Sequence, residues 1–290
     1  MKNKLLFNLF MLTPAIVLAQ SPVSGFMKEK GKGSAVISYA SEKYNQVYFV
    51  PSINDGVPIF NDVKIASQSL YLEYGVTNNF NVVINLPYIT ATGNATEATL
   101  KDLGFENKRA GLQDLKIYSK YNFHSYVFGK NQIDFIGVLG VEVPMGYKAD
   151  EGLQSIIAIG DQATKLNVSG MMMYKNQCGI FASGQIGNTF KNNQVPNALT
   201  TETKIGFAAK RFYIDAFFAT QLNSSAGVDI LQPGFTGFLP ATKVNYTRVG
   251  LNAYIPIVKY VGLTAGANTY LSGRNLGKAT GIYGGLVFNF

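Results

Sequence analysis

Apolar and polar residues alternate along most of the chain, and turn-forming residues separate the alternating segments. A period of two residues is that of a β-strand with one apolar face and one polar face. Between residues 114 and 123, for example, one face carries Leu115, Ile117, Tyr121 and Phe123, and the other carries Asp114, Lys116, Lys120 and Asn122. The pattern predicts an all-β fold of about twelve strands. They are expected near residues 33–49, 64–77, 79–90, 110–123, 131–145, 162–175, 177–190, 201–210, 212–222, 244–256, 260–272 and 279–290.

The connections between these segments alternate in length. Short ones at 77–79, 175–177, 210–211 and 256–259 are interleaved with long ones at 51–62, 91–109, 146–161, 191–200 and 223–243. Bacterial transmembrane β-barrels have short periplasmic turns and longer extracellular loops, and an even strand count leaves both termini in the periplasm. No linker divides the chain. We therefore expect residues 20–290 to form one domain, a transmembrane antiparallel up-and-down β-barrel.

The last predicted strand carries a possible assembly signal. Ile282, Leu286, Phe288 and Phe290 lie on its apolar face. An aromatic residue at the end of such a strand resembles the signal that outer-membrane barrels present to the barrel assembly machinery. Phe288 and Phe290 are the residues expected to carry this signal.

The first nineteen residues have the pattern of a secretory signal peptide. Lys2 and Lys4 precede an apolar stretch from Leu5 to Leu18, and small residues lead up to a cleavage site after Ala19. Residues 1–19 are thus expected to be removed on export, and the mature chain is expected in the bacterial outer membrane. Cys178 is the only cysteine, so internal disulfides cannot stabilise the exported protein.

The composition agrees with strands that face lipid. Charged residues make up 14% of the chain, against about 25% in soluble proteins. A soluble β-sandwich would also alternate, but the long strands and the export signal favour the membrane barrel. Aromatic residues near the strand ends are expected to form interfacial girdles. They are Phe80, Tyr88, Tyr121, Phe123, Tyr213, Tyr254, Tyr260 and Tyr270.

The charge balance does not indicate nucleic-acid binding. Loss of Lys2 and Lys4 with the signal peptide lowers the formal net charge from +8 to +6, and the basic residues are spread along strands and turns. An excess of this size could bias a pore toward anionic solutes or contact lipopolysaccharide phosphates. Outer-membrane lipid and lipopolysaccharide are therefore expected partners.

Motifs for catalysis, cofactors or metals are missing. His124 is the only histidine; it is expected in a periplasmic connection and has no companion for a metal site or a catalytic triad. An envelope hydrolase, which is an alternative to a channel and to a non-conducting barrel, would depend on His124. Cys178 is expected to be a small packed residue on a strand. The glycine-rich segments lack the helix and lysine of a phosphate-binding loop. We expect no enzyme activity and no cofactor.

Charged residues recur on the face predicted to line the lumen. The candidates are Glu73, Asp114, Lys116, Lys120, Asp134, Glu142, Lys165, Lys175, Asp215 and Arg248. They could set the electrostatic field and the selectivity of a pore. Alternatively, they could neutralise one another and fill a narrow lumen. The spacing of these residues along the sequence does not distinguish a selective pore from a filled lumen.

Two stretches resemble one outer-membrane family. Residues 72–82, Leu-Glu-Tyr-Gly-Val-Thr-Asn-Asn-Phe-Asn-Val, with Leu86-Pro87-Tyr88, and residues 111–121, Gly-Leu-Gln-Asp-Leu-Lys-Ile-Tyr-Ser-Lys-Tyr, are similar to the hairpins of transporter-like barrels of the phenol-degradation meta-pathway. Gln113 stands where that pattern has a second glycine. The resemblance implies a channel for small solutes, hydrophobic or aromatic ones included. A non-conducting surface-interaction barrel with a plugged lumen is the alternative.

Overall fold

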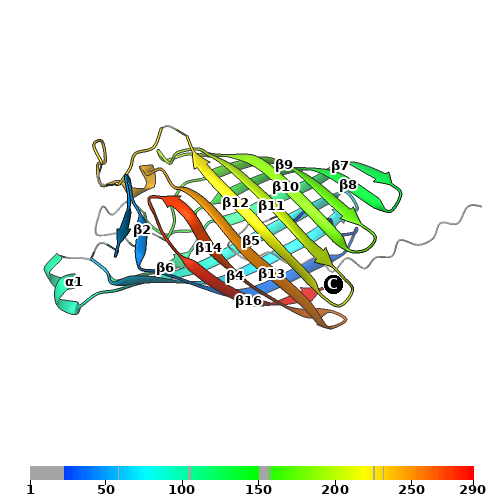
Figure 1. Cartoon of the computed structure of the whole chain (residues 1–290), viewed down its shortest axis with the longest axis horizontal. Coiled ribbons are helices and arrows are strands. Elements are labelled where there is room, and N and C mark those ends of the chain that lie inside the picture. The colour runs from blue at the N-terminus through cyan, green and yellow to red at the C-terminus, as the bar shows by residue number, and fades with distance from the viewer. Residues whose placement is uncertain are drawn as a thin grey trace, which may run out of the picture.

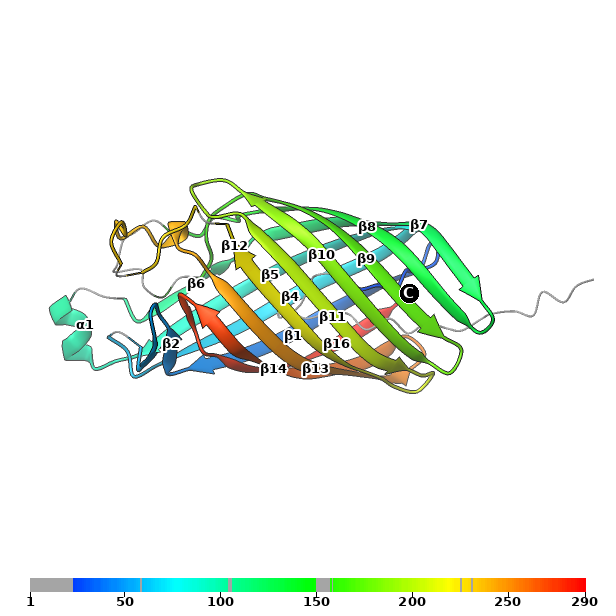
Figure 2. The same cartoon turned by 45° about the horizontal axis from the view of Figure 1, so that its top comes forward.

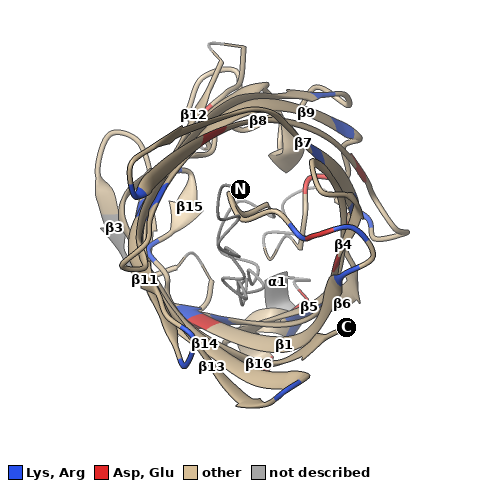
Figure 3. Cartoon of the chain, turned by 90° about the vertical axis from the view of Figure 1, so that its right-hand side faces the viewer, with Lys and Arg blue, Asp and Glu red and all other residues tan. Residues whose placement is uncertain are grey.

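The computed structural model describes residues 23–57, 59–103, 106–149, 157, 159–224, 226–230 and 232–290. Within these residues, twelve antiparallel strands form a closed barrel, as predicted (Figures 1 and 3). Two consecutive elements, β6 and β7, pair with the same neighbour and together make one of the twelve. The predicted signal peptide lies outside the described residues.

The bounds of the barrel strands follow the predicted segments within a few residues at most ends. They are β1 (Gly33–Tyr44), β4 (Asp62–Thr77), β5 (Phe80–Asn94), β6 (Lys108–Leu112), β7 (Leu115–Phe128), β8 (Asn131–Val143), β9 (Lys165–Asn176), β10 (Ile180–Lys191), β11 (Ala198–Ala208), β12 (Tyr213–Asn223), β13 (Asn245–Val258), β14 (Val261–Arg274) and β16 (Thr280–Asn289).

The barrel closes between its first and last strands. β1 pairs with β16 on one side and with β4 on the other. Where the seam ends, the Gly33 N–H donates to the Phe290 carbonyl at 2.9 Å, and the Phe290 N–H donates to the Gly33 carbonyl at 3.0 Å. The first and last strands therefore have no free edge, which is the condition for a sheet to persist in lipid.

The two ends of the barrel differ (Figures 1 and 2). One end, called here the turn end, carries the short connections and the C-terminus. The other, the loop end, carries the long connections, the helix α1 (Glu97–Leu103), the 3-10 turn η2 (Leu239–Ala241) and a small sheet of β2 (Gln46–Tyr48), β3 (Ile53–Asp55) and β15 (Leu276–Gly277). Among the described helices, none is long and apolar enough to cross a membrane.

Side chains alternate between an apolar outer face and a buried inner face. In β16, Ile282 on the outer face is 66% exposed, whereas Val287 on the inner face is fully buried. Other strands expose apolar side chains in the same way, including Leu70, Leu139, Ile186, Ile205 and Leu251. An apolar surface that runs over all strands is far larger than the patches of soluble proteins. It has the character of the lipid-facing band of a membrane barrel.

Three local predictions are wrong. The strand predicted at 33–49 ends at Tyr44, and the chain then leaves the barrel to form β2. His124 does not lie in a connection, because β7 continues to Phe128 past a bulge between Asn122 and His124. Cys178 is exposed in the turn before β10 instead of packed on a strand.

The predicted aromatic girdle is also partly wrong. Tyr88 and Tyr121 are exposed but lie in the middle of β5 and β7, Tyr260 is exposed in the turn before β14, and Tyr213 and Tyr254 are buried on the inner face. The reason is parity: Tyr213 lies two residues from Asp215, so both point into the lumen. The face on which a residue lies, and not its distance from a strand end, decides whether it can belong to the girdle.

Candidate functional site: the barrel lumen

The first described residues lie inside the barrel at its turn end (Figure 3). Val23 is 1% exposed and Phe26 is 4% exposed. The Phe26 ring meets the Phe181 ring edge-on, with centroids 5.1 Å apart, and lies 6.1 Å from the Tyr213 ring. Residues 23–32 are named the plug segment here. It brings apolar side chains into a lumen whose candidate residues from sequence were all charged.

An apolar cluster surrounds the plug segment. Inner-face residues from strands all round the barrel contribute to it, namely Val36, Tyr71, Val83, Tyr118, Ile136, Val138, Met171, Met173, Phe181, Tyr213, Tyr254 and Val287. All twelve side chains are at most 6% exposed. The cluster and the plug segment together form an apolar constriction at the turn end.

A buried ion pair anchors the plug segment to the wall. Lys120 Nζ lies 2.5 Å from Glu73 Oε1, and both side chains are at most 1% exposed. The same ammonium donates to the carbonyls of Ser24 at 2.9 Å and Phe26 at 2.7 Å. Asn81 Nδ2 donates to the same carboxylate at 3.1 Å. A charge buried inside the barrel needs hydrogen-bond partners, and the carbonyls of the plug segment supply them. Lys120 therefore holds the backbone of the plug segment.

The end of the plug segment runs directly against β4. The Gly31 N–H donates to the Gly75 carbonyl at 2.8 Å, and the Gly75 N–H donates to the Lys32 carbonyl at 2.9 Å. A Cβ atom at position 75 would lie 2.2 Å from the Glu29 carbonyl oxygen. Glycine at position 75 therefore permits the close approach of the two backbones.

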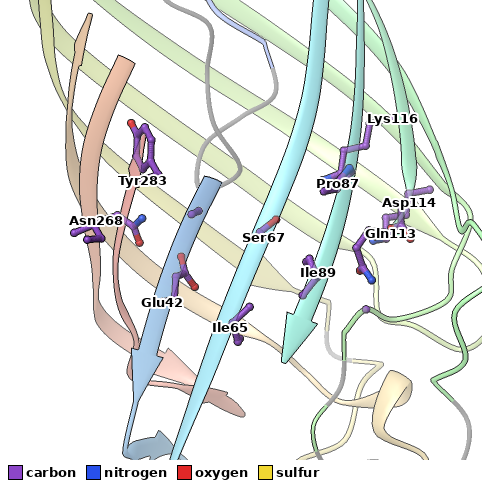
Figure 4. A pocket seen from close by; sticks show the side chains of 14 residues that line it. Glu42, Ile65, Ser67, Pro87, Ile89, Gln113, Asp114, Lys116, Asn268 and Tyr283 are labelled. Atoms are coloured by element: carbon purple, nitrogen blue, oxygen red, sulfur yellow. Dashed lines mark hydrogen bonds and ion pairs between the residues drawn. The ribbon is translucent and has the colours of Figure 1, made fainter. Parts of the chain in front are cut away.

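Beyond the constriction, toward the loop end, the lumen contains open cavities. A cavity of about 350 Å³ is lined mainly by polar side chains of β7 to β14, among them Asn167, Gln185, Thr189 and Gln221. A second, of about 220 Å³, lies against β1, β4 and β5 (Figure 4). A third, of about 480 Å³, lies under the loops. Lys165 borders all three, so they form one region, called here the vestibule.

Lysines of the vestibule are paired with carboxylates. Lys165 Nζ lies 2.7 Å from Asp114 Oδ2, 2.9 Å from Asp161 Oδ1 and 3.7 Å from Glu142 Oε2. Lys116 lies 3.8 Å from Glu142, and Lys191 lies 3.6 Å from Asp161. Positive and negative charges on this wall therefore balance locally. The pairing does not favour the anion preference considered from the net charge.

The opposite wall carries an arginine between two tyrosines. The Arg248 guanidinium lies 5.5 Å from the Tyr246 ring centroid and 5.3 Å from that of Tyr270, and its Nη1 donates to the Tyr270 hydroxyl at 3.3 Å. Arg248 is 7% exposed and borders the 350 Å³ cavity with both tyrosines. Arg248 thus presents a held cation with aromatic surfaces beside it to whatever fills the cavity.

Described residues of the connection between β8 and β9 are bonded to the inner wall at the loop end. Tyr147 is 6% exposed and its hydroxyl donates to Asp114 Oδ1 at 2.6 Å. The Gln162 N–H donates to the Tyr147 hydroxyl at 2.9 Å, and Gln162 Oε1 accepts from the Ala149 N–H at 2.9 Å. Burial and the hydrogen bond to Asp114 raise the pKa of Tyr147 well above its ordinary value. Tyr147 and Gln162 are therefore held against the inner wall.

The ten lumen candidates from sequence all lie on the inner face, in separate groups. Glu73 and Lys120 lie at the constriction, and Lys175 lies 2.5 Å from Asp134 near the turn end. Asp114, Lys116, Glu142 and Lys165 share one vestibule network. Asp215 accepts from Tyr213 and Asn252 at 2.6 Å each, and Arg248 lies on the far wall. Phe288 and Phe290 are exposed on the outer side of the closing strand.

Sequence reasoning missed the plug segment and several inner-face charges, including Glu42, Lys191, Glu202 and Lys204. Glu202 and Lys204 follow the same alternation as the ten candidates and could have been found by it. The plug segment offered a weaker signal, an apolar Val23 and Phe26 before the first strand. Among the described residues, no group of three or more His, Cys, Asp or Glu side chains is placed to hold a metal ion.

Comparison with known proteins identifies the fold. The crystal structure of an outer membrane channel from Pseudomonas putida F1 superposes with a TM-score of 0.71 at 11% identity, covering 93% of this chain and 100% of the channel. The KdgM and NanC porins each give a TM-score of 0.49, at 8% and 6% identity, covering 88% of this chain and 99% and 98% of theirs. No family model and no curated protein sequence matches the chain. The resemblance to the phenol-degradation family therefore stays a prediction. At 11% identity, the first of these structures shows that the chain has the fold of a twelve-strand outer-membrane barrel.

Proposed function

We propose that the chain is a bacterial outer-membrane channel for the passive passage of small polar solutes, with the plug segment closing its periplasmic end at rest. The apolar outer face, the closed seam and the alternation of short turns and long loops support the location. By the usual orientation of such barrels, the loop end faces the outside and the turn end faces the periplasm.

The vestibule is the observation that carries this proposal. A barrel that served only as a scaffold would fill its lumen with interdigitating side chains. Here cavities of about 350 and 480 Å³ adjoin one another between the loops and the constriction. Space of this size, bordered by amides, hydroxyls and paired charges, suits a hydrated solute entering from the loop end.

The lining also bears on the class of solute. Asn167, Gln185, Thr189 and Gln221 offer hydrogen-bond donors and acceptors in the widest part of the vestibule, and Tyr246 and Tyr270 add aromatic surface. This lining supports small, uncharged or zwitterionic polar solutes more than the hydrophobic ones suggested by the family resemblance. Lysines that are already paired with carboxylates give an anion little additional attraction.

A non-conducting barrel is the second candidate, and one observation favours it. Residues 23–26 of the plug segment and the surrounding apolar side chains are buried as deeply as a protein core. A solute can pass only if this constriction opens. The two candidates therefore differ in one property, the ability of residues 23–32 to leave the lumen.

Conductance of a Phe26→Ala variant tests the proposal. Truncating a buried Phe costs about 3–5 kcal/mol, so the closed position should lose much of its stability. In planar bilayers we expect the variant to conduct more frequently than the unchanged protein and to speed solute entry into liposomes. Phe218→Ala, which truncates an exposed ring on the outer face, is the matched control and should leave conductance unchanged. A folded Phe26→Ala barrel that never conducts would reject the channel.

A further inference from the structure

Three lysines on the outer face of the barrel lie in one row near the loop end. Lys43 of β1 is paired in register with Lys64 of β4, Lys64 with Thr92 of β5, and Thr92 with Lys108 of β6. All four side chains are exposed. Because adjacent strands lie about 4.8 Å apart, the row extends over roughly 14 Å of the outer surface.

A second outer-face row, with two tyrosines, a leucine and a glutamine, lies four residues closer to the membrane on each of these strands. In register order it consists of Tyr39, Gln68, Tyr88 and Leu112. Exposed Tyr39 and Tyr88 mark the level of the interfacial aromatic girdle. Four residues of a strand span about 14 Å, or roughly 10 Å along the axis of a barrel whose strands tilt by about 40°. The lysine row therefore lies at the height of lipid headgroups.

The row is confined to one side of the barrel. On strands β8 to β12, the described outer-face residues include no lysine or arginine, since Lys165, Lys175, Lys191 and Lys204 of these strands point inward. One carboxylate lies beside the lysine row: Asp62 is 3.4 Å from Lys43 Nζ, and Asn94 Nδ2 donates to Asp62 at 3.2 Å. The row keeps an excess of positive charge after this pairing.

Lys43 and Lys64 lie directly opposite each other, and Asp62, 3.4 Å from Lys43 Nζ, compensates one of their two charges. Like charges directly opposite one another across two strands destabilise a sheet. A phosphate group bridging two ammonium groups would reverse the sign of this interaction. The third lysine, on β6, lies one strand spacing beyond Thr92, whose hydroxyl can donate to the same ligand.

We propose that Lys43, Lys64 and Lys108 form a binding site for the phosphorylated headgroup of lipopolysaccharide in the outer leaflet. The site needs a ligand that presents more than one phosphate at headgroup height and acyl chains against the apolar band below. Lipid A has both features. The proposal rests on the outer-membrane location and on the orientation with the loop end outside, but not on solute passage.

Titration of the detergent-solubilised mature chain with bisphosphorylated lipid A tests this site. Bound lipid is counted by native mass spectrometry for the unchanged protein and for Lys43→Gln/Lys64→Gln/Lys108→Gln. One basic residue near an anionic lipid surface contributes about fivefold in affinity (about 1 kcal/mol). Because Asp62 offsets part of the charge, we expect the triple variant to bind at least about tenfold more weakly.

The matched control removes the same charge at the other end of the barrel. Lys130→Gln/Lys210→Gln/Lys259→Gln changes three exposed lysines of the turn-end connections and should bind lipid A as the unchanged protein does. Dephosphorylated lipid A should lose the difference between the two variants. Inorganic phosphate at the same phosphate concentration should not compete, because it lacks the acyl chains.

Two results would overturn the site. One is equal lipid A binding by the two triple variants, which would mean that the lysine row does not recognise phosphate. The other is full competition by inorganic phosphate, which would assign the row to free anions. Neither result depends on conductance, so the channel can fail in bilayers while the lipid site stands, and the reverse.

Discussion

The turn end and the loop end of the lumen are built from the same strands, yet their contents differ. At the turn end the inner face presents Val36, Val83, Ile136 and Val287, and the plug segment packs among them. At the loop end, strands β7 to β14 present amides, hydroxyls and paired charges around open cavities, whereas β4 and β5 contribute Val63 and Ala91 to a second apolar cluster with Tyr147. Alternation therefore determines which side chains point inward, but it does not determine whether the interior is dry or wet.

The two ends can therefore have different functions. The turn end is called here the dry end, and the loop end is called the wet end. The dry end can act as a barrier because an apolar constriction excludes water and hydrated solutes. The wet end can hold a solute because its polar groups replace part of the hydration shell. A channel needs both, and the boundary between them lies where Tyr118, a member of the apolar cluster, also borders the polar cavity.

The largest effect should come from breaking the ion pair of the dry end. Lys120→Met removes the closest cation from the buried Glu73 carboxylate, which keeps Asn81 and the more weakly interacting Lys28. It also removes the two hydrogen bonds from Lys120 Nζ to the plug segment. Loss of one member of a buried pair costs about 3–5 kcal/mol. We expect a reduction of this size in the free energy of unfolding, measured by urea titration with heat-modifiable gel migration as the readout.

Lys116→Met provides the matched comparison at the wet end. Lys116 is 27% exposed on its side chain and lies 3.8 Å from Glu142, which keeps Lys165 as a second partner. A solvated pair of this kind contributes about 0–1 kcal/mol. If both variants lost the same stability, the distinction between a dry and a wet end would be wrong.

The smallest effect should appear in the loops of the wet end at low pH. Two hydrogen bonds from Arg274, at 2.6 and 2.7 Å, lower the pKa of the Asp229 carboxyl to about 2. A lowered carboxyl pKa stabilises the folded loop above about pH 4, and this contribution is lost as the pH falls through about 2. Limited acid proteolysis between residues 224 and 244 should therefore increase only below pH 4.

Asp229→Asn is the control for this pH dependence. The variant keeps the side-chain shape but cannot titrate, so its loop should be cleaved at a rate that changes little between pH 6 and pH 2 beyond the intrinsic pH response of the protease. An unchanged acid-induced increase in the variant would assign the effect to another group.

Most of the barrel could be predicted from sequence because lipid imposes a simple rule. Each strand must show one apolar face, so residues such as Leu115 and Ile117 reveal both the strand and its orientation. The same alternation placed Asp114, Lys120 and Arg248 on the inner face. Tyr213 and Tyr254 follow the same alternation, since both lie on the inner face and not in the lipid-facing girdle.

The partners of the inner residues could not be predicted in the same way. Lys120 contacts Glu73 from a strand two positions away and Ser24 from a segment without strand periodicity. Such contacts depend on register, tilt and barrel diameter, which the alternation does not encode. The plug segment is also invisible to a strand-based search, because it satisfies its backbone through Lys120 and Gly75 instead of through a sheet.

A reversible crosslink between the plug segment and the wall tests the central claim most directly. An added Cβ at Gly25 would lie 3.0 Å from Met173 Cβ, close to the separation of about 3.8 Å in a disulfide. Gly25→Cys/Met173→Cys would be made with Cys178→Ser, which removes the native thiol, and Gly25→Cys/Cys178→Ser would serve as the single-cysteine control. We predict that the oxidised double variant is silent in planar bilayers and that reduction restores conductance, whereas the control responds to neither treatment. Equal conductance of the crosslinked and reduced forms would contradict the account.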